Sequence, residues 1–460
     1  MPILFNRYYP PRNLCFFFIE GFLIFLSVML VNLMFIGFNI FLIDFFDCAR
    51  QALTVTIVFQ LCLYFFDLYD LGNDISLFDT FTRIIQAFGV GCISLAIIYY
   101  FVKDLMIPTL IFWVGFLVIC LSVFSLRASY FRILRKRMFA QSIVVLGTGR
   151  LAADISREIE GRRDSGYRIL GFVGSNEPAY NPNHAPVHHR IEEYCNSMYA
   201  TMIDRIIVAA DDRRGTVPIQ KLIQCKMQGI MIDQGVDFFE RISGKLLVEK
   251  LDPSWIFFSD GFSFSRWKRW MKRTLDIAVS LPMLILSLPL LALAATVIKI
   301  ESAGPVLYRQ DRVGENSRVF QIIKLRSMRQ DAEKNGAVWA AVNDDRVTRF
   351  GSFMRKMRID ELPQLWNVLK GEMSIVGPRP ERPVFVEQLV KILPYYNIRH
   401  AAKPGVTGWA QVCYPYGAST EDALCKLEYD LYYLKNSSLA LDLFIILKTA
   451  KTVLFQKGSR

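Results

Sequence analysis

The chain has 460 residues, of which 53% are hydrophobic, and its formal net charge is +12. A mean hydropathy of +0.28 is higher than that of ordinary soluble proteins, so membrane segments are expected. The basic excess would also suit a nucleic-acid-binding protein, but the Lys and Arg residues lie beside apolar segments. No nucleic-acid partner is therefore expected, and the charge indicates basic flanks that face anionic lipid.

Four apolar stretches open the chain and predict four transmembrane helices within residues 1–130. They run over residues 14–43, 52–66, 84–102 and 107–126. Each can cross a bilayer core, which takes roughly 20 helical residues, if the bounds of the second are extended. Basic residues precede the first stretch at Arg7 and follow the fourth from Arg127, so both ends of this region are predicted to lie in the cytoplasm. Whether the spans also form a homodimer is left open by the sequence.

An alternation of β-rich and helical stretches over residues 138–250 predicts a Rossmann-like α/β domain. The first β-rich run leads into a G-x-G-x-x-A turn that contains Gly147 and Gly149 and opens a helix. Glycines there permit a tight turn and the approach of a phosphate to the helix N-terminus. The acidic residue that would bind a ribose is replaced by Ser175 and Asn176. Gly147 and Gly149 are thus cofactor-binding candidates with no cofactor named, and a structural or regulatory domain is favoured over redox chemistry.

A fifth apolar run, residues 277–298, lies near the start of a mainly helical catalytic domain predicted over residues 266–460. Pro282 and Pro289 interrupt this run, and each removes a helical hydrogen bond. Because both flanks are basic, both ends are expected on the cytoplasmic side. We therefore predict a re-entrant membrane helix over residues 272–300 that turns near Pro289, where Ser287 could satisfy a freed backbone group. The alternative, a kinked helix that crosses the bilayer, would place the rest of the chain outside the cell.

The segment from Arg355 to Trp366 has the densest pattern of charged residues. Apolar residues at helical spacing, from Leu362 to Leu369, predict a helix that begins here and ends at Gly371. Asp360 would be its N-cap, so an Asp-Glu pair would lie at a helix N-terminus, where free N–H groups favour phosphate.

This combination suits phosphoryl transfer. Asp360 could act as an ionised nucleophile whose pKa is kept low by Arg355 and Arg358, which would share one helix face. Glu361 could bind Mg²⁺, and the arginines could bind phosphate oxygens. In isolation, the same residues would also fit a capped helix with surface ion pairs.

Glycine and proline recur beside single basic residues in several further segments, as rigid loops that line a phosphate-binding cleft would require. These segments are Gly304–Gly314, Lys324–Met328, Val376–Glu381 and Lys403–Trp409, and Asp430–Asn436 follows them.

Together, these motifs closely resemble the bacterial sugar transferase family of polyprenyl-phosphate hexose-1-phosphate transferases, over about residues 272–454. The membrane spans and Rossmann-like domain resemble the large members that start capsule, exopolysaccharide or O-antigen assembly. The resemblance implies that Asp360 attacks the β-phosphorus of a UDP-hexose, releases UMP and forms an aspartyl-phosphosugar intermediate. Polyprenyl phosphate would then accept the sugar phosphate. It also implies a catalytic domain on the cytoplasmic side of the bacterial inner membrane.

The resemblance implies roles for individual residues. Lys324 and Asp430 would be further catalytic residues beside Asp360, and Glu361 would be the Mg²⁺ ligand. The substrate-binding residues would be Arg355, Arg358, Arg379, Lys403, Gly405 and Thr407. One departure is that Leu288, not serine, precedes Pro289. The sequence leaves open which sugar is transferred.

Two other functions fit the sequence less well. A membrane-anchored nucleotide-sugar epimerase or dehydratase would carry a Tyr-x-x-x-Lys pair after the glycine motif, but that spacing occurs at Tyr99 and Lys103, before the motif. A non-catalytic scaffold of polysaccharide assembly would not need the full set of acidic and basic motif residues.

Overall fold

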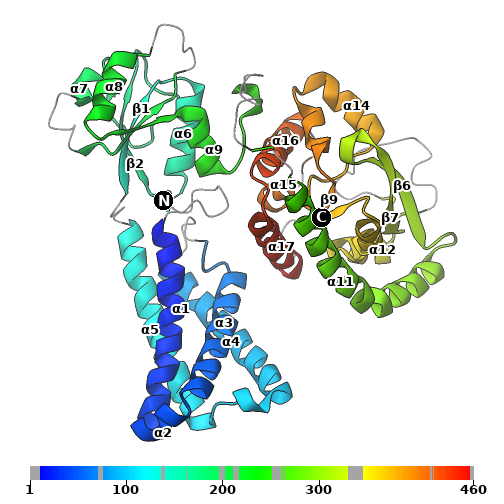
Figure 1. Cartoon of the computed structure of the whole chain (residues 1–460). Coiled ribbons are helices and arrows are strands. Elements are labelled where there is room, and N and C mark those ends of the chain that lie inside the picture. The colour runs from blue at the N-terminus through cyan, green and yellow to red at the C-terminus, as the bar shows by residue number, and fades with distance from the viewer. Residues whose placement is uncertain are drawn as a thin grey trace. The chain divides into compact units, whose positions relative to one another are not determined.

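The structure is a computed structural model. It describes residues 11–70, 76–135, 140–162, 164–195, 202–210, 217–250, 261–262, 265–329, 345–414, 417 and 419–455. The chain divides into two compact units, Met1–Ile242 and Ser243–Arg460, which are described in turn (Figure 1).

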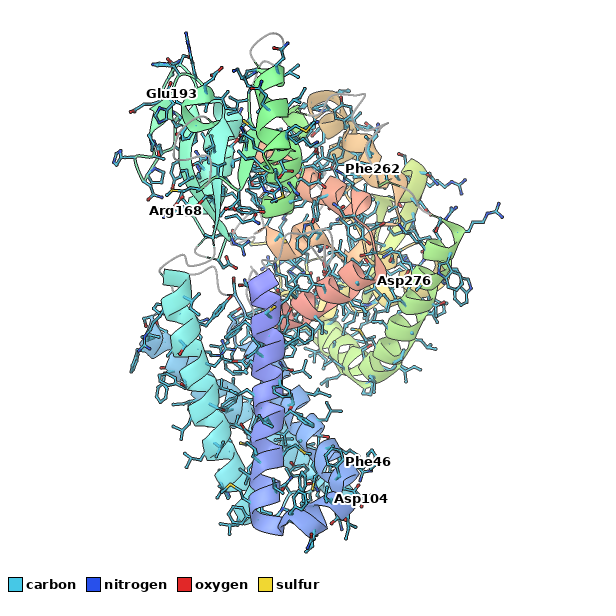
Figure 2. All side chains as sticks on the ribbon, turned by 60° about the vertical axis from the view of Figure 1, so that its left-hand side comes forward. Phe46, Asp104, Arg168, Glu193, Phe262 and Asp276 are labelled. Atoms are coloured by element: carbon cyan, nitrogen blue, oxygen red, sulfur yellow. The ribbon has the colours of Figure 1, made fainter. Side chains whose placement is uncertain are left out.

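The first unit begins with long apolar helices. They are α1 (Pro11–Ile36), α2 (Phe38–Ile43), α3 (Phe45–Phe65), α4 (Leu77–Phe101), the short η2 (Lys103–Leu105) and α5 (Thr109–Arg135). By length and composition α1, α3, α4 and α5 could each cross a membrane. Helix α1 packs against α3 and α5 around a core that includes Ile24 and Phe59. Phe46 and Asp104 lie at the same end of this helical region (Figure 2).

A parallel five-stranded sheet follows, in the order β3-β2-β1-β4-β5. Its strands are β1 (Gln141–Leu146), β2 (Tyr167–Val173), β3 (Val187–His188), β4 (Arg205–Val208) and β5 (Met231–Gln234). The accompanying helices are α6 (Arg150–Glu160), α7 (Glu192–Cys195), α8 (Ile219–Met227) and α9 (Gly235–Ser243). This is the strand order of a doubly wound fold, which reverses direction between β1 and β4. The predicted strands at β1, β2 and β4 are confirmed, whereas β3 and β5 were not predicted.

The second unit contains a fifth apolar helix, α11 (Arg266–Glu301), which also could cross a membrane by length and composition. It is continuous over 36 residues with Pro282 and Pro289 inside it, and it is visibly bent (Figure 1). Ser287 Oγ donates to the Leu284 carbonyl at 2.9 Å. Because Pro289 leaves the carbonyl four residues before it without a donor, Ser287 satisfies a neighbouring group and not the freed one.

Both ends of α11 are attached to the same fold. Near its start, Asp276 Oδ1 accepts hydrogen bonds from Ser374 Oγ at 2.8 Å and from Ile375 N at 2.9 Å (Figure 2). At its end, Glu301 Oε1 accepts one from Phe350 N at 3.0 Å. A straight helix of this length would extend about 54 Å. The bend lets both ends reach one compact unit.

The remainder of this unit is mainly helical, with two small sheets. An antiparallel pair, β6 (Leu307–Val313) and β7 (Val319–Leu325), precedes the parallel pair β8 (Ser374–Val376) and β9 (Gly405–Thr407). The helices are η4 (Val248–Lys250), η5 (Glu315–Ser317), α12 (Arg349–Lys356), η6 (Ile359–Glu361), α13 (Gln364–Lys370), α14 (Pro383–Ile392), η7 (Tyr396–Ala401), α15 (Trp409–Cys413), α16 (Thr420–Lys435) and α17 (Leu439–Leu454).

Candidate active site

The Asp-Glu pair lies in a short 3₁₀ turn, η6, and not at the N-cap of a helix. Helix α12 ends before Arg358, which has a left-handed φ of +54°, so Arg355 and Arg358 do not share a helix face. Helix α13 starts only after Pro363, whose missing N–H is tolerated at a helix start. The predicted N-cap is therefore wrong by one turn, because the chain reverses at Arg358 before the helix begins.

Helix α13 buries a different stripe from the predicted one. Leu365 and Val368 are buried, but Trp366 is 49% exposed. The buried Asn367 accepts a hydrogen bond from Ile323 N at 3.1 Å through its side chain and donates to the Gln321 carbonyl at 2.8 Å. These bonds fix α13 to β7, the strand that carries Lys324. The predicted helix end is confirmed, since Gly371 is the C-cap with φ +87°.

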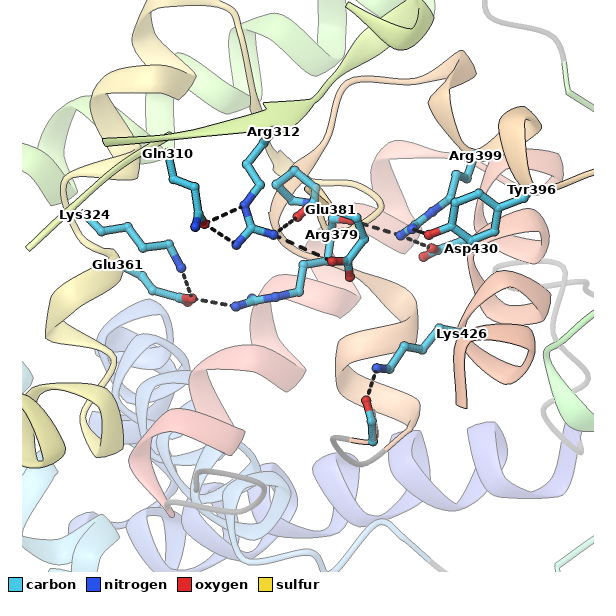
Figure 3. A network of polar contacts seen from close by, with 12 residues as sticks. Gln310, Arg312, Lys324, Glu361, Arg379, Glu381, Tyr396, Arg399, Lys426 and Asp430 are labelled. Atoms are coloured by element: carbon cyan, nitrogen blue, oxygen red, sulfur yellow. Dashed lines mark hydrogen bonds and ion pairs between the residues drawn. The ribbon is translucent and has the colours of Figure 1, made fainter. Parts of the chain in front are cut away.

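Glu361 gathers three cationic side chains. Its carboxylate accepts from Arg379 Nη2 at 2.8 Å and from Lys324 Nζ at 3.2 Å (Figure 3). It also accepts from Arg358 Nη1 at 3.5 Å. Burial alone would raise the pKa of Glu361, but these cations hold that pKa well below its usual value. Burial lowers the pKa of the Lys324 ammonium, against the pull of Glu361. The structure thus brings four sequence-predicted site residues together.

The neighbouring Asp360 differs from Glu361, because its carboxylate has no hydrogen-bonded cation among the described residues and its pKa is raised. It is 7% exposed, and no side chain or backbone group in the described part of the chain donates a hydrogen bond to its carboxylate. Burial, and then the charge of Glu361, raise the pKa of Asp360 to about 6, although Lys324 and Arg355 oppose the shift. The expectation that arginines keep this pKa low is therefore wrong for Asp360, because the cations contact Glu361 instead. Arg355 itself donates to Ser327 Oγ at 2.9 Å.

The candidate Mg²⁺ ligand in the described part of the chain is the Glu361 carboxylate. Among them no group of three or more His, Cys, Asp or Glu residues is placed to hold a metal. Mg²⁺ usually keeps several waters and binds one or two carboxylates together with substrate phosphates. Glu361 Oε2 has only the 3.5 Å contact with Arg358, so it retains an acceptor site. The donor set fits a Mg²⁺ ion that binds with a diphosphate.

Asp430, a predicted catalytic residue on α16, contacts Arg399 rather than the Asp-Glu pair. Its Oδ2 accepts from Arg399 Nη2 at 2.7 Å, and the carboxylate is 2% exposed. Burial raises the pKa of Asp430 to about 6, with Arg399 opposing the shift. Arg399 was missed by sequence reasoning because it lies outside the glycine- and proline-containing segments.

The predicted loop from Lys403 to Gly408 contains the short strand β9 and packs against the Gly377–Glu381 turn. A Cβ on Gly405 would lie 2.1 Å from Gly377 N, so the close approach of the two segments requires glycine. Thr407 Oγ1 lies 2.6 Å from Thr449 Oγ1 and fixes the loop to α17. Lys403 is half-buried near Gly371 at the end of α13.

Gly147 and Gly149 lie in the first unit, in the turn between β1 and α6. Gly147 has φ +125°, and a Cβ there would lie 2.6 Å from the Ala209 carbonyl oxygen. Gly149 is the N-cap residue of α6. The conformation of Gly147 and its close backbone approach account for that glycine without a ligand.

Comparisons with known proteins find relatives of both units of the chain. A model of the bacterial sugar transferase family matches residues 267–456, and a model of a CoA-binding domain matches residues 64–215. The UDP-N-acetylgalactosamine-undecaprenyl-phosphate N-acetylgalactosaminephosphotransferase of Aeromonas hydrophila is 49% identical over 41% of this chain and 45% of that protein. The undecaprenyl-phosphate glucose phosphotransferase of Komagataeibacter xylinus is 32% identical over 70% of this chain and 61% of that protein.

The chain thus spans less than two thirds of the length of these two relatives. A shorter relative, the exopolysaccharide production protein PSS of Rhizobium leguminosarum, is 41% identical over 39% of this chain and 92% of its own length. The family match covers Lys324, the Asp360-Glu361 pair and Asp430. The chain therefore belongs to the bacterial sugar transferase family.

Proposed function

We propose that this chain transfers a sugar 1-phosphate from a UDP-sugar to undecaprenyl phosphate and releases UMP, as the first membrane step of polysaccharide assembly. The observation that carries the proposal is the buried Asp360 carboxylate, which accepts no described hydrogen bond and lies beside a cation-lined Glu361. The names of two relatives specify undecaprenyl phosphate together with N-acetylgalactosamine or glucose. These names favour a transferase over an epimerase or a scaffold.

The proposed reaction proceeds in two displacements. In the first, the ionised Asp360 carboxylate attacks the β-phosphorus, the bond from this phosphorus to the bridging oxygen breaks, and UMP leaves. In the second, an oxygen of undecaprenyl phosphate attacks the same phosphorus, and Asp360 leaves as a free carboxylate. Asp360 must therefore lose its proton before the first step.

The cations around Glu361 would bind the diphosphate. Arg379, Lys324 and Arg358 already converge on one anion, so the diphosphate oxygens would meet preorganised positive charge. Glu361 would hold Mg²⁺, which supplies further shielding of the phosphate charge when it is bound. Arg379 would orient the β-phosphate toward Asp360.

For the membrane, we propose that α1, α3, α4 and α5 cross the bacterial inner membrane. Helix α11 would be re-entrant, with the catalytic unit on the cytoplasmic side. The attachment of both ends of α11 to one fold supports this arrangement, since a crossing helix would separate its ends across the bilayer. Two prolines within α11 permit the bend.

The first test measures UMP release from membranes that contain the protein, Mg²⁺ and undecaprenyl phosphate, with separate UDP-sugars. We expect release with at least one sugar and none above background for Asp360→Asn, which keeps the shape of the side chain but removes the nucleophile. Asp104→Asn, a change at an exposed position of η2 in the first unit, is the matched control. Full activity of Asp360→Asn would exclude the proposed nucleophile.

A further inference from the structure

The turn from Gly377 to Glu381 is held in place by hydrogen bonds that its backbone carbonyls accept. Two of its residues, Pro378 and Pro380, have no N–H, so the turn has fewer backbone donors of its own. Four successive carbonyls instead accept hydrogen bonds from other segments. The pairs are Gly405 N to Pro378 O at 2.9 Å, Arg399 Nη2 to Arg379 O at 2.9 Å, Arg312 Nη1 to Pro380 O at 3.0 Å, and Val313 N to Glu381 O at 2.9 Å.

Two of these four donors are arginine side chains, and each is held in one orientation. Arg399 is 5% exposed, and its guanidinium also donates to Asp430 at 2.7 Å and to Tyr396 OH at 2.5 Å. Arg312 donates through Nε and Nη2 to Gln310 Oε1 at 3.1 and 2.7 Å (Figure 3). A planar guanidinium with acceptors on several edges cannot rotate without losing bonds.

The turn delivers one side chain to the candidate active site. Arg379 extends from the middle of the clamped carbonyls, and its Nη2 lies 2.8 Å from Glu361 Oε1. Arg399 bonds the backbone carbonyl of this same residue. The hydrogen bond from Arg399 therefore fixes the backbone from which the Arg379 side chain extends. Arg399 itself is held by its ion pair with Asp430.

We propose that Arg399 and Arg312 are positioning residues that clamp the Gly377–Glu381 turn and so aim Arg379 at the diphosphate, and that Asp430 acts through Arg399 and not on the substrate. The aim of Arg379 rests on the proposed transferase function, whereas the clamp does not. Asp430 is then required because an unpaired Arg399 would be free to leave the Arg379 carbonyl.

The test is Arg399→Lys, because one ammonium cannot bond Asp430, Tyr396 and the Arg379 carbonyl in the geometry of a guanidinium. We expect kcat/KM for UMP release to fall on the order of 10- to 100-fold, as small misplacements of binding groups do. In an Arg379→Ala background the same change should cost less than about threefold, since the side chain that the clamp aims is gone. Independent, multiplicative losses would overturn the proposal.

Glu428→Gln is the matched control. It weakens another ion pair of α16, the one between the buried Glu428 and the half-buried Lys245 at 3.1 Å, which does not lead to Arg379. Its effect on kcat/KM should be the same in the wild-type and Arg379→Ala backgrounds. An effect that also disappears with Arg379→Ala would mean that the coupling reports general loosening of α16.

Hydrogen exchange of the substrate-free protein separates the clamp from the proposed function. Exchange of the Val313 and Gly405 amides, which donate to the Glu381 and Pro378 carbonyls of the turn, should rise in Arg399→Lys and stay unchanged in Glu428→Gln. Unchanged exchange in Arg399→Lys would overturn the clamp. If the wild type releases no UMP with any sugar, the proposed function fails while this measurement still decides whether Arg399 holds the turn.

Discussion

The turn after β1 and the turn between β8 and α14 both contain the glycines or prolines expected near a phosphate. In the first, Gly147 is required by its φ of +125° and by the Ala209 backbone beside it. In the second, donors from β6, η7 and β9 hold the backbone, and Arg379 extends to Glu361. Glycine and proline thus report how closely backbones approach. The charge that binds an anion comes from side chains that the fold brings together.

The two turns should respond very differently to the loss of an arginine. Arg379→Ala should lower kcat/KM for UMP release by about 100- to 1000-fold, the cost of deleting one preorganised charge stabiliser. Arg150→Ala, beside Gly149 at the start of α6, should change it by less than about threefold. Equal losses would show that the first turn also serves the chemistry.

The pH dependence of the reaction should also respond to Arg379 and not to Arg150. Because the pKa of Asp360 is raised to about 6, kcat/KM should fall about tenfold per pH unit below that value, as a proton occupies the attacking carboxylate. Arg379 lowers this pKa, so Arg379→Ala should move the acid limb to higher pH, whereas Arg150→Ala should leave it in place. A wild-type profile that is flat between about pH 5 and pH 7 would contradict the assignment.

Substitutions of the two adjacent carboxylates should shift the thermal unfolding midpoint in opposite directions, by a few degrees. The folded pKa of Asp360 is raised, so its charge weakens the fold as pH rises from about 4 to 6, and this loss is complete at about pH 7. Asp360→Asn should therefore raise the thermal unfolding midpoint by about 2–6 °C, for a gain of about 1–2 kcal/mol.

Glu361 should behave in the opposite way. Its folded pKa is lowered by its cations, so its stabilising contribution is present above about pH 4.5 and disappears in acid. Glu361→Gln should lower the unfolding midpoint at neutral pH, and the two variants should differ less in mild acid. A midpoint that moves in the same direction for both would contradict the contrast between these adjacent carboxylates.

The sequence predicted what depends on local pattern. The strands at β1, β2 and β4 and the helix end at Gly371 are confirmed. Lys324, Arg379 and Glu361, which were predicted as site residues, lie together in the structure. The glycine and hydrophobic patterns are local properties of the chain, and the family motifs marked the charged residues.

What the sequence did not predict depends on contacts between distant segments. The exposed Trp366 and the buried Asn367 reverse the apolar pattern, because Asn367 bonds β7 more than 40 residues away. The clamp by Arg312 and Arg399 likewise joins segments that no spacing connects.

Two separate attachments fix the orientation of α11 relative to the catalytic unit, which a single attachment would not do. Helix α11 is tied near its start through Asp276 and at its end through Glu301, both to the fold that carries Asp360. Under the proposed re-entrant insertion, the depth of this helix sets the height of Asp360 above the bilayer. The bent helix would then fix the distance between the Asp360 carboxylate and the membrane surface, where the lipid phosphate lies.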